Sequence, residues 1–175
     1  MSHGTKGFTL IELLVVVAII GILAALLIPN AMSAIQKAKI RGTQKDISTI
    51  ATTIAHYITD KGAPPANNGD IDTTLESVLS STYIKVLPLK DQWGNNFKVY
   101  TGTNVNGNYG LSDASLDDVL IASYGRRNAL ESWTYNASEP EAGLYTISAA
   151  ADFEKDLINL NGAFIRSPRA GLSGT

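Results

Sequence analysis

The sequence predicts an α+β protein in which one long N-terminal helix packs on a small antiparallel sheet. Three observations support this prediction. An apolar run covers residues 8–28, and apolar residues then recur at helical spacing as far as residue 58. After residue 92 come several short segments of strand-like composition, separated by glycine and asparagine. One helix followed by short strands favours a sheet with the helix against one face.

The apolar run from Phe8 to Ile28 is long enough to span a membrane. As a helix it would cover about 31 Å, close to the ~30 Å hydrocarbon core of a bilayer. Glu12 is the single carboxylate in this run. An ionised side chain inside a bilayer costs roughly 2.5–3.5 kcal/mol, so Glu12 needs either an interfacial position among headgroups or a partner.

The residues around Glu12 resemble the N-terminus of type IV pilin and pseudopilin precursors. The resemblance consists of a short polar leader ending in Gly7, the sequence Phe8-Thr9-Leu10-Ile11-Glu12-Leu13, the long apolar run and Pro29. It implies a pilin-like fold, leader cleavage by the prepilin peptidase after Gly7, N-methylation of Phe8, and a role for Glu12 in recruiting a subunit into a filament. Cleavage would also place an α-amino group four residues from Glu12. The amine of a shifted second copy could therefore pair with this carboxylate.

The same resemblance implies a cellular setting. The chain would be a single-pass protein of the bacterial inner membrane, with a cytoplasmic N-terminus and a periplasmic head, and would form a helical homopolymer. Its other partners would be minor pseudopilins, the prepilin peptidase and N-methylase, the inner-membrane assembly platform and the membrane lipid. Charge asymmetry favours the opposite orientation, because cations gather after the run: Lys37, Lys39, Arg41 and Lys45.

Composition narrows the function classes. Sixteen acidic residues against fourteen basic ones give a net charge of −2, so no nucleic-acid partner is expected. No nucleophile–base pattern or phosphate-binding loop is present, and with two histidines we expect no catalytic residues. The chain has no cysteine, so the head must be held by its core, a metal or neighbouring subunits. A secretory signal cleaved near Ala24-Ala25 is a competing interpretation. The apolar region of such a signal is about 7–15 residues long, however, which is shorter than the run over residues 8–28.

The helix is expected to continue as an amphipathic segment over residues 29–62. Gly21 and Pro29 are its weak points, since glycine has low helix propensity and proline lacks an amide donor. The helix should end near Lys61-Gly62, before Pro64-Pro65. The expected buried stripe consists of Ile35, Ala38, Ile47, Ile50, Ala51, Ile54, Tyr57 and Ile58.

These observations predict four segments along the chain. They are a leader over residues 1–7, a membrane-spanning and assembly helix over 8–28, its amphipathic continuation over 29–62, and an α+β head over 63–175. Within the head, Thr73 to Glu76 matches a capping box before a short helix near 74–81. Strands are expected over 97–100, 119–124 and 144–149. A hairpin is expected over 159–165, turning at Asn161-Gly162.

A second motif carries the resemblance further. Asp91-Gln92-Trp93-Gly94-Asn95-Asn96-Phe97 is similar to the Asp-Pro-Trp-Gly-Asn-Pro-Tyr signature of the major pseudopilins of type II secretion. Gln92 and Asn96 stand where that signature has prolines. The motif positions are Asp91, Trp93, Gly94, Asn95 and Phe97. The residues themselves predict a turn at Gly94-Asn95 and an aromatic anchor on the core.

A calcium site is predicted at Asp152, Glu154 and Asp156, where alternating carboxylates offer oxygen ligands. No other cofactor is expected. In the resembling pseudopilins the calcium loop follows a serine-glycine turn and carries several aspartates. Here Ser123-Tyr124-Gly125 is followed by Arg126-Arg127-Asn128, which lacks them.

The favoured function is a structural subunit that assembles through its N-terminal helix into a periplasmic pseudopilus driving type II protein secretion. The resemblance also allows the major subunit of a type IV pilus, serving adhesion, motility or DNA uptake. An alternative of another class is a monomeric binding module whose helix is only an anchor.

Overall fold

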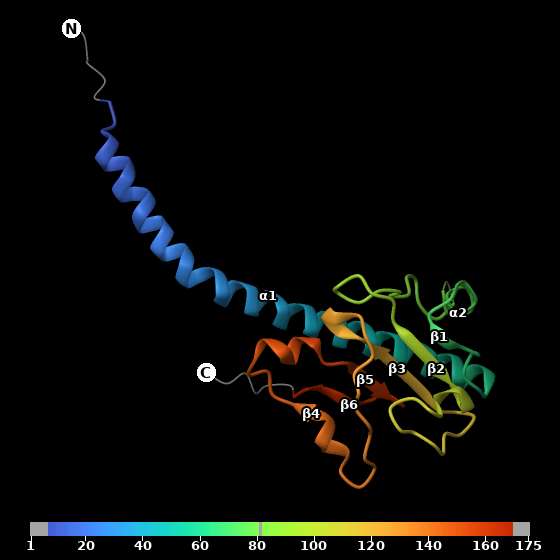
Figure 1. The fold of residues 1–175 in the computed structure, drawn as a ribbon. Helices are drawn as coiled ribbons and strands as arrows, with labels where there is room; N and C mark the ends of the chain where they lie inside the picture. Colours follow the sequence, from blue (N-terminus) through green and yellow to red (C-terminus); the bar gives the residue numbers. More distant parts are fainter. Residues whose placement is uncertain (1–6, 81, 170–175) are drawn as a thin grey trace. The chain divides into compact units, whose positions relative to one another are not determined.

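The computed structural model describes residues 7–80 and 82–169. The chain divides into two compact units, residues 1–37 and 38–175, which we call the N-terminal unit and the C-terminal unit. A single helix, α1, runs from Leu10 to Lys61 and so contributes to both (Figure 1). The helix is unbroken at Gly21 and at Pro29, so neither residue ends it.

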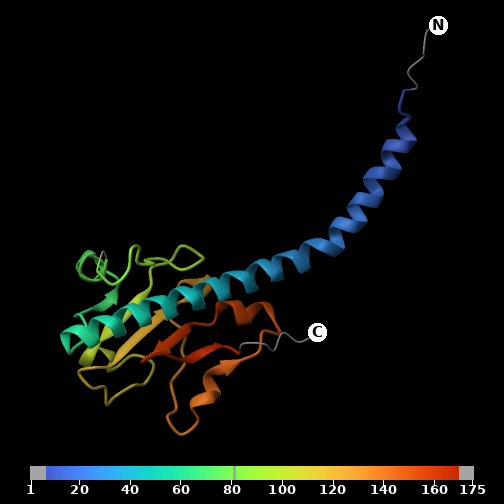
Figure 2. The same cartoon turned by 180° about the vertical axis from the view of Figure 1, so that it is seen from behind.

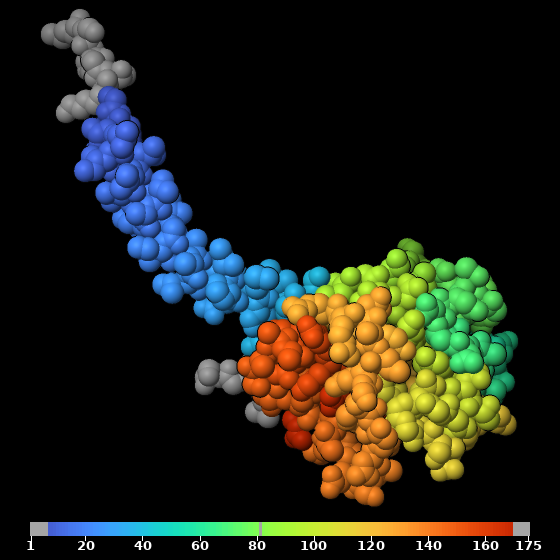
Figure 3. Space-filling model, in the orientation of Figure 1, coloured from blue at the N-terminus to red at the C-terminus, as the bar shows by residue number. Residues whose placement is uncertain are grey.

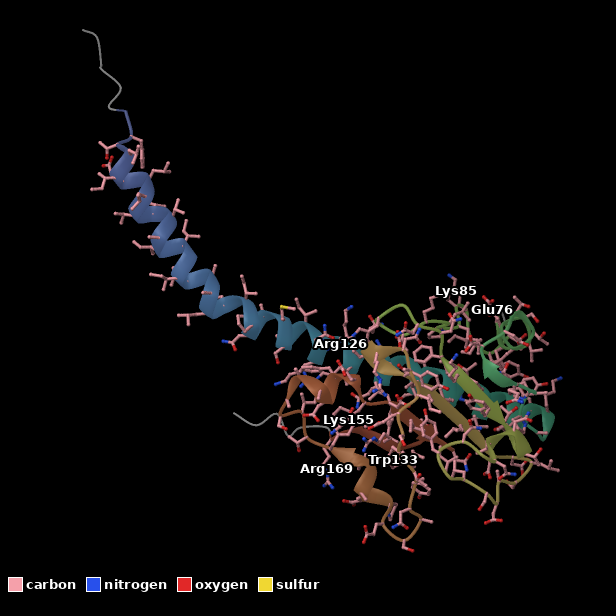
Figure 4. All side chains as sticks on the ribbon, in the orientation of Figure 1. Glu76, Lys85, Arg126, Trp133, Lys155 and Arg169 are labelled. Carbon is pink, nitrogen blue, oxygen red and sulfur yellow. The ribbon has the colours of Figure 1, made fainter. Side chains whose placement is uncertain are left out.

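The described part of the N-terminal unit consists of the first portion of α1 and the three residues before it. None of residues 7–37 is buried, and Figure 4 shows their side chains standing away from the helix axis on all sides. Among the described residues, α1 is the one helix long and apolar enough to cross a membrane by length and composition. This agrees with the prediction for residues 8–28, although the helix begins at Leu10 rather than Phe8.

The C-terminal unit is one six-stranded sheet with the second portion of α1 along one face (Figure 2). The strand order is β1-β2-β3-β5-β6-β4, and every pairing is antiparallel except the short parallel pair β4–β6. The strands are β1 (Asn68–Asp70), β2 (Lys98–Thr101), β3 (Val119–Ser123), β4 (Leu144–Tyr145), β5 (Leu157–Leu160) and β6 (Ala163–Pro168). A short helix, α2 (Thr73–Leu79), lies between β1 and β2 in the chain.

Two hydrophobic clusters hold this unit together. The larger one joins Ile47, Ile50 and Ile54 of α1 to Phe97 and to Leu157 of β5. The smaller one lies on the other face of the sheet and contains Leu120, Ala122, Ile158 and Ile165. Because β3 is buried along its whole length, it contributes residues to both clusters.

Several boundaries agree with the sequence prediction. The helix α1 ends at Lys61, and Gly62 follows with φ +80, the left-handed conformation that glycine adopts at low cost. The hairpin β5–β6 turns at Asn161 and Gly162, both with positive φ. The α+β fold with a long helix on a small sheet is therefore confirmed.

Other local predictions were wrong. Ile35 and Ala38 are exposed, because the sheet covers α1 only from Ile40 onwards. The cap of α2 is Asp72, one residue before the predicted Thr73, and its Oδ1 accepts from the Leu75 backbone N–H at 2.7 Å. Because Leu75 has no polar side chain to return a bond, this is a single cap and not the predicted capping box. The strand predicted over 144–149 is limited to Leu144–Tyr145.

The segment 125–142, for which no structure was predicted, forms two short 3₁₀ turns, η2 (Gly125–Arg127) and the start of η3 (Pro140–Gly143), joined by irregular chain. Its orange atoms lie on the face of the C-terminal unit seen in Figure 3. Trp133 and Tyr135 are half-buried and pack against the smaller hydrophobic cluster, so this segment covers one side of the sheet.

Candidate functional site

The N-terminus of α1 is built around a reciprocal cap between Thr9 and Glu12. The Thr9 backbone N–H and hydroxyl donate to Glu12 Oε2 at 2.9 and 2.6 Å, and the Glu12 backbone N–H approaches Thr9 Oγ1 at 3.4 Å. This is the capping-box arrangement, in which two backbone donors of the first helical turn are satisfied by side chains. The sequence carries its signature as Thr-x-x-Glu, but the cap was not predicted from it.

The cap leaves part of the Glu12 carboxylate for another donor. Within the described residues, Glu12 Oε1 accepts no hydrogen bond, and Glu12 itself is exposed. The carboxylate is thus held at a fixed place near the chain start with one oxygen directed to its surroundings.

The residues predicted to be processed lie immediately before this cap. Gly7 and Phe8 are exposed and precede the first residue of α1, and the Phe8 side chain is 79% exposed. The leader predicted over residues 1–7 lies outside the described residues except for Gly7. The cleavage, N-methylation and assembly assignments of Gly7, Phe8 and Glu12 stay predictions, since no contact tests them.

In the C-terminal unit, the motif at Asp91–Phe97 forms a tight loop around one buried carboxylate. Asp91 Oδ1 accepts from the backbone N–H groups of Trp93 and Asn95, both at 2.9 Å, and Oδ2 accepts from the Ser123 hydroxyl at 2.7 Å. Gly94 takes φ +92 at the apex. The predicted turn at Gly94-Asn95 is thereby confirmed, with Asp91 as its organiser.

The same motif ties three elements together. The Asn95 side-chain amide donates to the Gly125 carbonyl at 2.8 Å, just beyond the end of β3. Phe97 is fully buried, and Trp93 packs against the larger cluster, as predicted for an aromatic anchor. Gln92 reaches α1: its backbone N–H donates to Thr43 Oγ1 at 3.2 Å and its side-chain amide to Asp46 Oδ2 at 2.8 Å.

The contact with Thr43 depends on a departure from the resembling signature. A proline at position 92 would have no backbone N–H to donate, whereas Gln92 has one. Gly42 makes room for the Gln92 side chain, since a Cβ there would come within 2.8 Å of Gln92 Cγ. The substitution therefore adds two polar contacts between the motif loop and α1.

The structure does not bring Asp152, Glu154 and Asp156 together as ligands. Asp152 Oδ1 accepts from Lys155 Nζ at 2.7 Å, while its Oδ2 accepts from the backbone N–H groups of Ser148 and Ala149. Glu154 pairs with Arg126 at 2.6 Å. Within residues 7–80 and 82–169, no group of three histidine, cysteine or acidic side chains could hold a metal ion. These three carboxylates therefore do not fit a shared calcium site in this arrangement.

The electrostatics of the two aspartates differ. Burial alone would raise the pKa of Asp152, but the hydrogen bonds from Lys155, Ser148 and Ala149 hold it well below its usual range. For Asp156, burial dominates and raises the pKa to about 6, despite bonds from the Glu131 backbone N–H and the Tyr109 hydroxyl.

A half-buried ionic network, not predicted from the sequence, fastens the 125–142 segment to the sheet. Glu131 pairs with Arg166 of β6 through both carboxylate oxygens and also accepts from the Asp156 backbone N–H. The Arg166 guanidinium lies 5.1 Å from the Trp133 ring and 5.2 Å from the Tyr145 ring. Figure 4 labels Trp133 and Lys155 in this region.

Comparisons with known proteins agree with the N-terminal pattern. Residues 3–28 match the family profile described as the prokaryotic N-terminal methylation motif. The type II secretion system core protein G of Pseudomonas aeruginosa is 34% identical over 121 residues, which are 64% of this chain and 84% of that protein. Its counterpart in Escherichia coli strain K12 is 31% identical over 137 residues, covering 73% and 90% of the two chains.

A fimbrial protein of Neisseria meningitidis serogroup B is 31% identical over 91 residues, covering 52% of this chain and 54% of that protein. No solved structure matches. The long helix with an unburied apolar start, the methylation motif and the small sheet define a pilin-like subunit. Within that class, the chain belongs to the family of the type II secretion system core protein G, the major pseudopilins.

Proposed function

We propose that this protein is a structural subunit, not an enzyme, and that it polymerises through the first part of α1 into the periplasmic pseudopilus of a type II secretion system. The observation that carries the proposal is that none of residues 7–37 is buried although the stretch is almost entirely apolar. Such a surface is unstable in water and needs lipid or other protein around it. A filament subunit has both, lipid before assembly and neighbouring helices after it.

In this proposal the peptidase removes the leader after Gly7, Phe8 becomes the methylated N-terminus, and Glu12 offers a carboxylate to the new amine of the next subunit. The Thr9–Glu12 cap supports this role, since it restrains Glu12 near the chain start and leaves Oε1 for an incoming donor. The inner membrane stores the subunit, with its head in the periplasm. Minor pseudopilins, the peptidase and the assembly platform are the expected partners.

Crosslinking in cells that express the secretion system tests the proposal. Wild-type protein should give a ladder of oligomers, whereas the monomeric binding module would give monomers alone. Glu12→Ala should be processed normally but lose the ladder, because the carboxylate acts only in assembly. Gly7→Ala should keep its leader. If the Glu12→Ala ladder equals that of the wild type, charge pairing through Glu12 is wrong.

The type IV pilus is a second candidate, since a fimbrial protein is among the relatives. Deleting the chromosomal gene distinguishes the pseudopilus from the type IV pilus. Loss of an exported enzyme from the medium with normal twitching motility indicates type II secretion, and the reverse result indicates a pilus.

The calcium prediction stays a prediction that no described contact supports. A thermal denaturation of the C-terminal unit with calcium and with chelator tests it, because a ligand bound to the folded state raises Tm. An unchanged Tm would rule out a calcium site at Asp152, Glu154 and Asp156.

A further inference from the structure

A groove runs beside α1 in the C-terminal unit. It has a volume of about 530 Å³ and lies between α1 and the loop that leads into β3. Its helical wall presents Ser48, Thr52 and Ala55, whose spacing of four and three residues places them on one face. All three are exposed and have short side chains. A second helix could therefore approach this wall closely.

The opposite wall is acidic. Asp117 and Asp118 line the groove next to Val119, and Asp117 is exposed. Asp118 is partly engaged, because it accepts from the Ser115 backbone N–H at 2.7 Å and from the Asn161 side-chain amide at 2.8 Å. His56 is the remaining titratable lining residue. An occupant of this groove should bring cationic side chains to the Asp117 side.

The chain carries a segment of that character, residues 31–41 of α1. Met32 and Ile35 are 59% and 54% exposed. With Lys39 they fall at helical spacings of three and four, so two apolar side chains and one cation share a face. Lys37 and Arg41 flank that face.

Among the described residues, neither the acidic wall of the groove nor the cations of residues 37–45 take part in an ion pair. The five pairs are Asp70–Lys98, Glu154–Arg126, Asp152–Lys155, Glu131–Arg166 and Glu141–Arg169. None of them, within the part of the chain described, includes Asp117 or Asp118, or a cation of residues 37–45. The acidic wall and the cationic segment thus carry complementary charges that form no ion pair among the described residues of the same copy.

We propose that the groove between α1 and Asp117–Val119 receives residues 31–41 of α1 from a second copy of this chain. This inference rests on the proposed filament function and names the surface that a neighbouring subunit occupies. In the proposed filament the groove of each copy receives the segment of the next copy, head to tail, so the terminal copies keep a free groove or a free segment for another copy. A contact of this kind propagates instead of closing into a dimer.

Cysteine pairing tests the contact, since the chain has no cysteine of its own. One full-length copy carries Ile35→Cys, and a second copy with a size-shifting tag carries Thr52→Cys. We expect a mixed disulfide between them on mild oxidation of membranes that contain the filament. Ser77→Cys, exposed on α2 away from the groove, replaces Thr52→Cys as the control and should give at least fivefold less product.

Charge reversal tests whether the acidic wall of the groove pairs with the cations of residues 31–41 from a second copy. Asp117→Lys in the Thr52→Cys copy should reduce the mixed disulfide about fivefold, the effect of roughly 1 kcal/mol lost from one charge pair. Lys39→Glu in the Ile35→Cys copy should restore it. Glu139→Lys, an equal charge change at an exposed residue outside the groove, should have no effect.

Three results would overturn the proposal. Filaments that pellet normally, with equal product from Ser77→Cys, would place the neighbour elsewhere and leave the filament function standing. A fall caused by Asp117→Lys without rescue by Lys39→Glu would assign the acidic wall to another occupant. Absence of filaments in the wild type would remove both this inference and the proposed function.

Discussion

The two portions of α1 obtain their stability in opposite ways. From Ile40 onwards one face of the helix is buried against the sheet, and Ile47, Ile50 and Ile54 are fully inaccessible to solvent. Before residue 38 the helix is more apolar, yet no side chain in the described part is buried. The first portion therefore depends on its surroundings and the second on the rest of its own chain.

The exposed hydrophobic residues follow the same division. In the described C-terminal unit the exposed large hydrophobic side chains are few and scattered: Val78, Val86, Leu116 and Leu130. In the N-terminal unit they are continuous along the helix. Scattered exposed side chains are ordinary for a soluble domain, whereas a continuous apolar surface marks a membrane or protein contact. The comparison predicts that mutations in the two portions will act on different measurements.

The largest expected difference concerns core side chains. Phe97→Ala should lower the free energy of unfolding of the C-terminal unit by about 3–5 kcal/mol, because it removes a fully buried ring. Ile20→Ala should leave that free energy unchanged. Urea titration followed by tryptophan fluorescence checks this, since both tryptophans, Trp93 and Trp133, lie in the C-terminal unit. Equal losses for the two variants would contradict the division.

The next effect concerns the carboxylate at the centre of the motif loop. Asp91→Ala should destabilise the C-terminal unit by about 2–4 kcal/mol, because two backbone donors and the buried Ser123 hydroxyl lose their acceptor. Glu139→Ala, at an exposed side chain, should stay within about 0.5 kcal/mol of the wild type. The same urea titration measures both. A small effect of Asp91→Ala would mean that water replaces the carboxylate.

A pH dependence should be confined to the C-terminal unit. Burial raises the pKa of Asp156 to about 6 in the folded state, against about 3.9 unfolded. The folded state then holds a proton that the unfolded state releases between these values. Stability should accordingly fall by about 2–3 kcal/mol as pH rises from about 4 to about 6.

Asp156→Asn should remove that slope in unfolding titrations run with chelator from about pH 4 to 8. The pKa of Asp152 is lowered, so its contribution has the opposite sign and is lost only as pH falls below about 4. A slope between about pH 4 and 6 that survives in Asp156→Asn would assign the titration to another group.

The smallest effect compares the two helix caps. Asp72→Ala should cost the C-terminal unit about 1 kcal/mol, because Leu75 loses its capping acceptor. Thr9→Ala removes an equivalent cap from α1 but should leave the stability of the C-terminal unit unchanged. Its effect should appear as lower helicity of residues 8–28 in micelles by circular dichroism. A change in C-terminal stability on Thr9→Ala would show that the units are coupled.

The elements predicted well from the sequence are those fixed by local chemistry. The glycine after Lys61, the Asn161-Gly162 turn and the apolar run each follow from conformational or solvation preferences of a few neighbouring residues. The exposure of Ile35 was predicted wrongly, because helical spacing gives the face of a residue but not how far the sheet extends along it.

The parts of the site that escaped prediction depend on residues distant in sequence. Glu131 meets Arg166 and Asp156 only after the strands have paired, so no local pattern announced the network. Asp91 was identified as part of a motif, but its bond to Ser123 required the position of β3. The predicted calcium ligands are a different case, because Lys155 lies within their own stretch of sequence. The structure pairs Lys155 with Asp152 and Arg126 with Glu154, and calcium binding stays a prediction.

The placement of α1 first in the chain and of β5 near its end has a consequence for synthesis. Ile54 and Leu157 belong to one core cluster, but about 100 residues separate them, which at 5–20 residues per second takes a ribosome roughly 5–20 s. During that interval β1, β2 and β3 are made, but the part of the α1 face that packs on Leu157 has no β5 to cover it. The second portion of α1 in a nascent chain therefore keeps part of its apolar face uncovered until the last strands arrive, which makes this portion the expected binding site for a chaperone during synthesis.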